Sequence, residues 1–397
     1  MTETWALATL WLGLALAATL LSIWFRIATA LSEIVVGTVA QLIIGALMGG
    51  AILGTDQSWI KFLSGTGAIV LTFLAGAELD PVVFKMKWKE ASVVGLASFA
   101  IPFLGCAAVA YWLLHWNGQA SWLAGIAMST TSVAVVYAVM LELGLNKTSY
   151  GKTLLAACFV TDMGTVVALG LIFSPFTYKT LVFVFVLVAL GFVLPWLTPR
   201  FFKRYGGRPS ELEAKYLLLS LFGMGALALW AGSEAVLPAY LIGMVLAGTV
   251  GKDHALVRRL RTLTFGLLTP FYFIRAGSLV SVPALLATPL VFVAFLVSKV
   301  FFKFVAVLPV TQFFNRRNGA EAKEAKTESF YTTLLMSTGL TFGSIASLFG
   351  LTHGIIDTAQ YSYLVAAVIA SAVVPTMIAN AFYLPRHLLQ EKKTSTE

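Results

Sequence analysis

Asp162 is the side chain of this sequence whose position most demands a chemical explanation. It lies near the middle of an apolar run, within Phe-Val-Thr-Asp-Met-Gly, where lipid would leave its charge unsolvated. A charge at the bilayer centre costs about 2.5–3.5 kcal/mol on insertion scales. Because burial favours the uncharged form of an acid, a proton or a small cation must neutralise the carboxylate. The two would compete for the same oxygens, which is the chemistry of an exchange site. A structural ion pair is the alternative.

Three basic residues lie inside other apolar runs. Lys299, in Leu-Val-Ser-Lys-Val-Phe, and Arg275, in Tyr-Phe-Ile-Arg-Ala-Gly, are both far from the ends of their runs. Either side chain can neutralise Asp162 or the carbonyl end of a broken helix, so we predict that both compensate charge. Lys303 follows one turn after Lys299, and we expect its ammonium to reach the inner membrane surface by snorkelling.

Hydroxyl groups can add further ligands to such a site. A hard cation that has lost its water prefers oxygen ligands. One threonine directly precedes Asp162, and a hydroxyl-rich stretch lies earlier in the chain. The predicted ion and proton site therefore consists of Asp162, Thr161, Thr130, Thr131 and Ser132.

Two stretches mix hydroxyl and glycine residues into apolar runs. The first is Ser-Thr-Thr-Ser at 129–132, and the second contains Ser337, Thr338, Gly339 and Thr341. Such residues weaken a helix, and lipid tolerates the freed backbone groups only where protein or a water cavity satisfies them. Helices broken near the midplane would place carbonyls and helix ends beside a bound ion. Close packing between helices through small residues is the alternative.

The composition indicates that membrane helices position these residues. Of the 397 residues, 59% are hydrophobic and 11% are charged, whereas soluble domains carry about 25% charged residues. The mean hydropathy is +0.87. We therefore predict an all-α polytopic membrane protein, a single transporter domain over 1–397 with no soluble regulatory domain. Cys106 and Cys158 lie in apolar runs and predict neither a disulfide framework nor a metal site.

Apolar runs of about 20 residues predict thirteen transmembrane helices. Their approximate ranges are 5–25, 34–54, 61–79, 91–115, 119–144, 152–174, 179–197, 214–231, 234–250, 265–284, 286–311, 327–350 and 360–385. No basic region precedes the first run, so we expect a retained helix and not a cleaved signal peptide. The long inner segment 198–215 is expected to be the hinge between two halves.

The distribution of basic residues predicts the orientation of these helices. If the N-terminus is outside, the inner segments contain 22 of the 27 Lys and Arg residues, and the outer segments contain only Lys61 and Lys179. This asymmetry follows the positive-inside rule. We therefore expect a protein of the cell (inner) membrane with a cytoplasmic C-terminus. The net charge of +9 then reflects topology and not nucleic-acid binding.

Two segments suggest an internal repeat. Residues 128–145, MSTTSVAVVYAVMLELGL, resemble residues 336–351, MSTGLTFGSIASLFGL. In the predicted topology the first runs from outside to inside and the second from inside to outside. Inverted repeats are the usual design of secondary transporters. An intramembrane hydrolase is disfavoured, because there is no second catalytic acid and no serine with an intramembrane histidine.

Several short motifs occur in an order that resembles the monovalent cation:proton antiporter-2 family, the Nap-type sodium and Kef-type potassium exchangers. They lie at 73–81 (FLAGAELDP), 130–133 (TTSV), 141–144 (LELG), 160–162 (VTD), 270–273 (PFYF) and 298–300 (SKV). The resemblance implies an inverted-repeat, sodium/proton-antiporter-like fold in which 119–144 and 327–350 are crossed, discontinuous helices. Asp162 matches the ion-binding aspartate of this family, and Lys299 matches the basic residue on the facing helix.

The resemblance also implies a homodimer with an elevator-like movement. Spans at about 5–79 and 214–284 would form the dimer domain, 91–174 and 286–385 the moving core, and 179–197 the linker. Thr161 stands where many sodium exchangers have a second acid, which favours electroneutral one-for-one exchange. The expected substrates are H⁺ and Na⁺ (or K⁺, Li⁺). We expect no cofactor, and we expect membrane lipid to surround the protein. A K⁺/H⁺ antiporter of the same fold and a sodium-coupled organic solute symporter are the alternatives.

Overall fold

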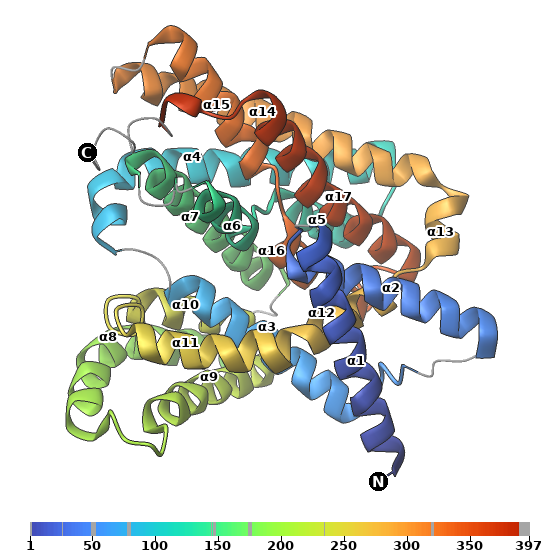
Figure 1. Ribbon diagram of the computed structural model, residues 1–397, viewed down its shortest axis with the longest axis vertical. Helices are drawn as coiled ribbons and strands as arrows, with labels where there is room; N and C mark the ends of the chain where they lie inside the picture. Colours follow the sequence, from blue (N-terminus) through green and yellow to red (C-terminus); the bar gives the residue numbers. More distant parts are fainter. Residues whose placement is uncertain are drawn as a thin grey trace. The chain divides into compact units, whose positions relative to one another are not determined.

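The computed structural model describes residues 2–25, 27–48, 53–77, 81–143, 145, 148–173, 177–233, 235–318 and 321–388. Within these ranges the regular secondary structure is entirely helical (Figure 1). The chain forms two compact units, each built from two separate stretches. Unit 1 comprises Met1–Pro81 and Val166–Leu279, and unit 2 comprises Val82–Thr165 and Val280–Glu397.

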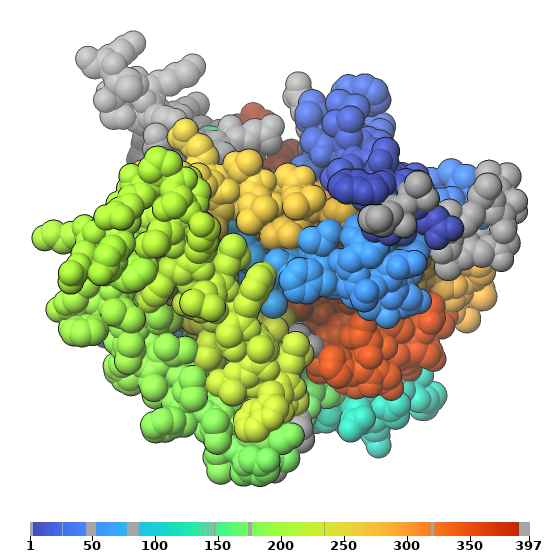
Figure 2. Space-filling model, turned by 90° about the horizontal axis from the view of Figure 1, so that it is seen from below, coloured from blue at the N-terminus to red at the C-terminus, as the bar shows by residue number. Residues whose placement is uncertain are grey.

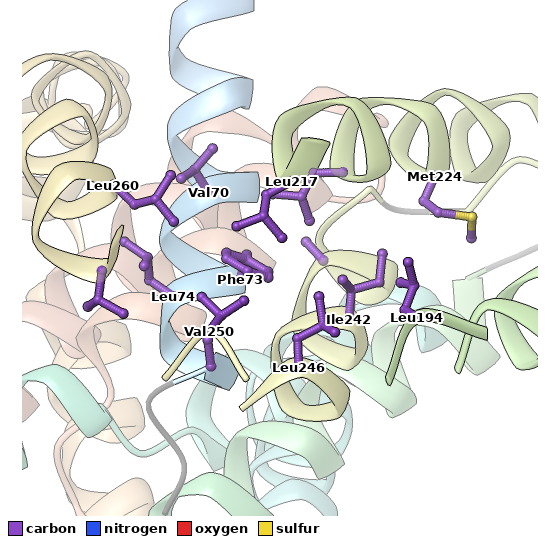
Figure 3. Packing of buried hydrophobic residues seen from close by; sticks show 14 of the residues in the cluster. Val70, Phe73, Leu74, Leu194, Leu217, Met224, Ile242, Leu246, Val250 and Leu260 are labelled. Carbon is purple, nitrogen blue, oxygen red and sulfur yellow. The ribbon is translucent and has the colours of Figure 1, made fainter. Parts of the chain in front are cut away.

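Unit 1 is organised around the contact between α3 and α10. Its helices are α1 (Thr2–Phe25), α2 (Thr29–Met48), α3 (Ser58–Ala77), α8 (Tyr178–Tyr205), α9 (Leu212–Trp230), α10 (Val236–Leu246), α11 (His254–Leu263) and α12 (Thr269–Ser278), the last preceded by the π-helical turn η3 (Thr264–Leu268). Phe73 of α3 packs among Leu217, Ile242 and Leu246 in the core (Figure 3). A side chain at Gly243 would collide with the Phe73 carbonyl, so glycine permits the close approach of these two helices.

Unit 2 holds the segments expected to form the moving core, apart from the end of α7. Its helices are α4 (Pro81–Ala108), η1 (Val109–Leu113), α5 (Gly118–Ser129), α6 (Val133–Glu142), α7 (Ser149–Phe173), α13 (Val282–Ala287), α14 (Pro289–Arg317), α15 (Ala322–Met336), α16 (Leu340–Thr352) and α17 (Thr358–Phe382). α7 continues from unit 2 into unit 1 after Thr165. Local signals define several helix starts: the Asn117 side chain accepts a hydrogen bond from Ala120 N–H, and Asp357 and Gln360 form a capping box.

The described helices are those of a multi-pass membrane protein. Nine helices or helix runs in the described ranges are long and apolar enough to cross a bilayer, and two shorter apolar helices accompany them. α8 is the most peripheral of the nine, with large apolar side chains such as Phe185 and Phe192 exposed. Figure 2 shows α8 and α9 at the surface of unit 1 on the side in view. Each of the thirteen predicted spans overlaps at least one of the described helices, while residues 49–52, 78–79, 144, 174 and 234 of the predicted ranges lie outside the described residues.

Two details of the predicted spans are wrong. The expected hinge 198–215 is helical up to Tyr205. Within this part of α8, Arg200 donates to Trp196 O, and its guanidinium lies 4.3 Å from the centre of the Trp196 ring. The predicted span 265–284 is interrupted, because α12 ends at Ser278 and Ser281 caps a new short helix, α13. This interruption coincides with the boundary between the two units.

Candidate functional site

Two helix interruptions face each other inside unit 2. α5 ends at Ser129 and α6 begins at Val133, with Thr130 extended at φ −61° and ψ 154°. α15 ends at Met336 and α16 begins at Leu340. The backbone N–H of Ser132 donates to Thr338 O at 3.0 Å, so the two interruptions are joined directly. The hydroxyl-rich stretches of the sequence therefore do break their helices, and helix packing alone does not account for them.

Three side-chain contacts reinforce this connection. Thr130 Oγ1 donates to Gly339 O at 3.1 Å, and Thr131 Oγ1 donates to Met336 O at 2.9 Å. Ser132 Oγ and Thr341 Oγ1 share a hydrogen bond of 3.2 Å. Because the region is buried, the first interruption supplies the donors that the freed carbonyls of the second require. The hydroxyls of Ser337 and Thr338 instead bond to carbonyls of their own helix, Thr333 O and Leu335 O.

Asp162 lies on α7 with a side chain that is 1% exposed. Its Oδ1 atom has no hydrogen-bond partner among the residues that the structure describes, and the backbone amide of Thr131 acts electrostatically on the carboxyl group. An unpaired buried carboxylate oxygen is costly and is available to a proton or a cation. Thr161, the predicted neighbouring ligand, directs its hydroxyl to Gly95 O and Ala157 O, both at 3.1 Å. Thr161 therefore connects α7 to α4.

Two buried lysines of α14 lie near this carboxyl group. Lys299 Nζ donates to Thr130 O at 3.2 Å, and Lys303 Nζ donates to Ser98 Oγ at 2.8 Å and to Thr131 Oγ1 at 2.9 Å. Both side chains are 0% exposed. Both ammonium groups act electrostatically on the Asp162 carboxyl, Lys303 more strongly than Lys299.

The expectation that Lys303 snorkels to the membrane surface is wrong. Phe295, Lys299, Lys303 and Val307 recur every four residues, and all four are buried. They therefore form one face of α14, and Lys303 points inward with its neighbours. The short distance of Lys303 from the end of its apolar run suggested a position at the membrane surface. The spacing of four residues from Lys299 was the better signal, because it places both side chains on the same face of the helix. Nothing in the sequence distinguished Ser98, the residue of α4 whose hydroxyl accepts a hydrogen bond from Lys303.

Arg275, the second predicted charge-compensating residue, belongs to a different part of the fold. It lies on α12 in unit 1, whereas Asp162 lies in unit 2. Its Nε atom donates to Thr55 O at 3.0 Å, in the connection before α3. Arg275 also acts electrostatically on Asp56, and together with the Lys61 hydrogen bond, which has the larger effect, it lowers the pKa of that exposed carboxyl. The carbonyl that Arg275 binds is therefore not part of either helix interruption.

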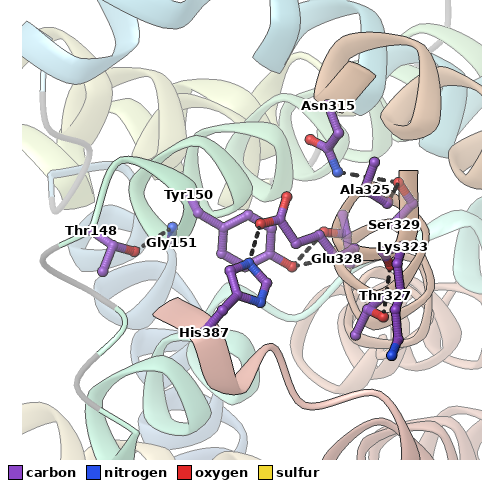
Figure 4. A network of polar contacts seen from close by, with 11 residues as sticks. Thr148, Tyr150, Gly151, Asn315, Lys323, Ala325, Thr327, Glu328, Ser329 and His387 are labelled. Carbon is purple, nitrogen blue, oxygen red and sulfur yellow. Dashed lines mark hydrogen bonds and ion pairs between the residues drawn. The ribbon is translucent and has the colours of Figure 1, made fainter. Parts of the chain in front are cut away.

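A cavity of about 370 Å³ lies within unit 2. Its lining includes the first turns of α7, from Ser149 to Ala157, and the acidic side chains Glu90 and Glu328. Polar contacts line one wall (Figure 4): Tyr150 donates to Glu328 O at 3.2 Å, and His387 pairs with the Glu328 carboxylate at 2.8 Å. Because Ala157 also accepts the hydroxyl of Thr161, the cavity ends close to the turn of α7 that carries Asp162.

Two interrupted helices are hydrogen-bonded to each other at their interruptions, and a buried carboxylate and buried amino groups lie beside them. This arrangement is typical of the core of a secondary transporter. The chain belongs to the sodium/hydrogen exchanger, transmembrane family, whose model matches residues 14–382. It is therefore a multi-pass membrane transporter of the class that exchanges monovalent cations for protons, and not an enzyme.

Individual relatives agree with this assignment. The "Probable Na(+)/H(+) antiporter 3" of Methanocaldococcus jannaschii is 27% identical over 278 residues, which cover 65% of this chain and 69% of that protein. The "Na(+)/H(+) antiporter" of Enterococcus hirae is 28% identical over 263 residues, 60% of this chain and 65% of that protein. The solved structure of the sodium proton antiporter MjNhaP1 from Methanocaldococcus jannaschii matches 98% of this chain and 99% of that one, with a TM-score of 0.68 and 15% identity, which establishes the shared fold.

Proposed function

We propose that the protein exchanges a monovalent cation, with Na⁺ preferred, for protons by alternating access centred on Asp162. The observation that carries the proposal is the buried Asp162 carboxyl group, which has an unpaired oxygen and lies next to the joined helix interruptions. A bound proton and a bound cation neutralise the carboxylate equally well. The empty, charged form is penalised in a dry core, so the site crosses the membrane only when it is loaded. That rule produces exchange without leak.

The surrounding groups have distinct roles in this mechanism. Thr130, Thr131 and Ser132 supply the oxygens that replace water around a desolvated cation. Lys299 compensates the negative charge of the carbonyl end of α5 through its hydrogen bond to Thr130 O. Thr161 positions Asp162 by tying α7 to α4. Arg275 stabilises unit 1 through its hydrogen bond to Thr55 O.

The remaining expectations complete the proposal. Thirteen spans form an inverted repeat in which α5–α6 and α15–α16 cross, the N-terminus is outside and the C-terminus is cytoplasmic. Unit 2 moves as the core of an elevator, and unit 1, through spans at 5–79 and 214–284, forms the contact of a homodimer. The concentration of the site residues in unit 2 supports this division of roles. The cavity beside α7 supports a cytoplasmic route for ions, since polar side chains of α7 and α15 line it and it reaches Ala157, which accepts the hydroxyl of Thr161.

Proton flux in proteoliposomes tests the proposal directly. An inward gradient of Na⁺, K⁺ or Li⁺ is imposed, and the internal pH is followed with the membrane potential clamped to zero. We expect Na⁺ to drive alkalinisation, with a smaller response to K⁺. A larger response to K⁺ would establish the potassium exchanger instead. Sodium-driven uptake of an organic anion without proton counterflow would refute antiport.

A further inference from the structure

The Lys299 amino group lies where the two helix interruptions meet. Its Nζ atom donates to Thr130 O at 3.2 Å, in the first interruption, and lies 3.5 Å from Thr130 Oγ1. The same threonine hydroxyl donates to Gly339 O, in the second interruption, at 3.1 Å. Lys299 and Thr130 are both fully buried. The end of the lysine side chain is therefore packed among groups of both interruptions.

Gly339 leaves open the space that the Lys299 amino group fills. A methyl group added to Gly339 would overlap Lys299 Nζ and would also crowd Thr130 Oγ1. The φ angle of Gly339 is −151°, outside the left-handed region that favours glycine over other residues. The lysine, and not this backbone angle, therefore excludes a side chain at position 339.

The matching position in the first interruption carries a side chain. When the similar segments 128–145 and 336–351 are aligned from their shared Met-Ser-Thr, Gly339 corresponds to Thr131. The hydroxyl of Thr131 accepts a hydrogen bond from Lys303 at 2.9 Å. The two interruptions therefore receive the two lysines of α14 differently, one with a hydroxyl group and the other with an empty position.

We propose that Gly339 is a positioning residue, whose missing side chain allows the Lys299 amino group to lie between the two interruptions. The proposal rests on the proposed exchange function, in which Lys299 has a part, and adds the residue that fixes where its amino group lies. The flexible four-carbon stem of lysine permits many other positions. A side chain at position 339 would therefore move the amino group away from Thr130 O and leave the backbone in place.

A role confined to the backbone makes a different prediction. Glycine disfavours helix, so in that role Gly339 only keeps the link 337–339 non-helical. An added methyl group would then have the same effect whether or not the Lys299 amino group is present. The two roles therefore separate in a double-mutant cycle between positions 339 and 299.

The experiment measures thermal unfolding in detergent for the wild type, Gly339→Ala, Lys299→Met and the double variant. Methionine keeps the stem of lysine as far as the ε position but lacks Nζ, so it empties the space beside Gly339. We expect Gly339→Ala to lower the Tm by about 2–4 °C when Lys299 is present and to leave it unchanged in the Lys299→Met background. An equal loss in both backgrounds would overturn the proposal. If Gly339→Ala alone does not fold, a folded double variant supports the proposal and an unfolded one overturns it.

Two other glycines provide matched controls. At Gly343, in α16, an added methyl group would overlap Val368, so Gly343→Ala should lower the Tm equally with and without Lys299→Met. At Gly223, in α9, nothing lies within 4 Å of an added methyl group. Gly223→Ala should therefore have the same small effect in both backgrounds.

Sodium-driven proton flux at several clamped potentials provides a readout that a backbone role would not move. We expect the dependence of the flux on potential to change in Gly339→Ala as it does in Lys299→Met, with no further change in the double variant. A change in Lys299→Met that is absent from Gly339→Ala would overturn the positioning role. If the wild type shows no cation-driven proton flux, the exchange function fails, whereas normal wild-type exchange without coupling between the two positions refutes only the role of Gly339.

Discussion

Ser132 and Thr338 are joined by a backbone hydrogen bond of 3.0 Å, although they belong to two different interrupted helices. Each residue lies in a short non-helical link, at 130–132 and 337–339. The two links therefore stabilise each other, and a change in one must be transmitted to the other. The backbone amide of Thr131, in the first link, acts electrostatically on the carboxyl group of Asp162, which connects this pairing to the proposed ion site.

Thr131→Val tests whether this connection is essential. Valine keeps the shape of threonine but removes the hydroxyl that donates to Met336 O and accepts from Lys303. Leaving these buried groups unpaired should lower the free energy of unfolding by about 1–3 kcal/mol and should change the apparent KM for Na⁺. Thermal unfolding in detergent and proteoliposome flux measure the two effects.

Thr376→Val is the matched control for this substitution. Its hydroxyl donates to a carbonyl of its own helix, Ala372 O, outside the site. It should leave the KM for Na⁺ unchanged. If Thr131→Val has no more effect on the KM than this control, Thr131 is not a ligand.

Lys299→Ala should retain exchange but alter stability and voltage dependence. The substitution removes the donor to Thr130 O, and the positive charge that compensates the carbonyl end of α5 disappears with it. Flux measured at several clamped potentials, together with thermal unfolding, separates these effects. Loss of all exchange at wild-type stability would show that Lys299 takes a direct part in transport.

Competition between protons and cations at one carboxylate predicts the pH dependence of transport. Because the cation binds only the deprotonated acid, lowering the pH should raise the apparent KM for Na⁺. The rise should approach about tenfold per pH unit where a single proton competes, while the maximal rate changes less. A KM that is constant across the acidic range would show that the two ions do not share a site.

Much of this arrangement could be predicted from the sequence, because lipid imposes strong constraints on residue types. Apolar length located the helices, and the clustered hydroxyls at 129–132 and 337–341 located both interruptions, since a helix in lipid rarely tolerates such residues without a partner. Asp162 was identifiable from the cost of a charge in an apolar run. These signals are local, and each is carried by a single stretch of chain.

Contacts between distant segments could not be predicted from the sequence. Lys303 was expected at the membrane surface because the sequence does not reveal its partners, Ser98 on α4 and Thr131 in the link between α5 and α6. Arg275 was predicted to compensate charge at the site; the partner that the structure gives its Nε atom is Thr55 O in unit 1. The direction of the Thr161 hydroxyl depended on the close approach of α4 at Gly95, where a side chain would collide with Val160. Periodicity does not identify such partners.

The substitution Asp162→Asn tests the central claim most directly. Asparagine preserves the size of the side chain but cannot release a proton or attract a cation by its charge. Sodium-driven proton flux is measured in proteoliposomes at zero potential, with Asp56→Asn, at an exposed ion pair, as the control and with size-exclusion chromatography to confirm folding. We expect a folded protein without exchange for Asp162→Asn and wild-type flux for Asp56→Asn. Sodium-driven proton flux at the wild-type rate in Asp162→Asn would contradict the account.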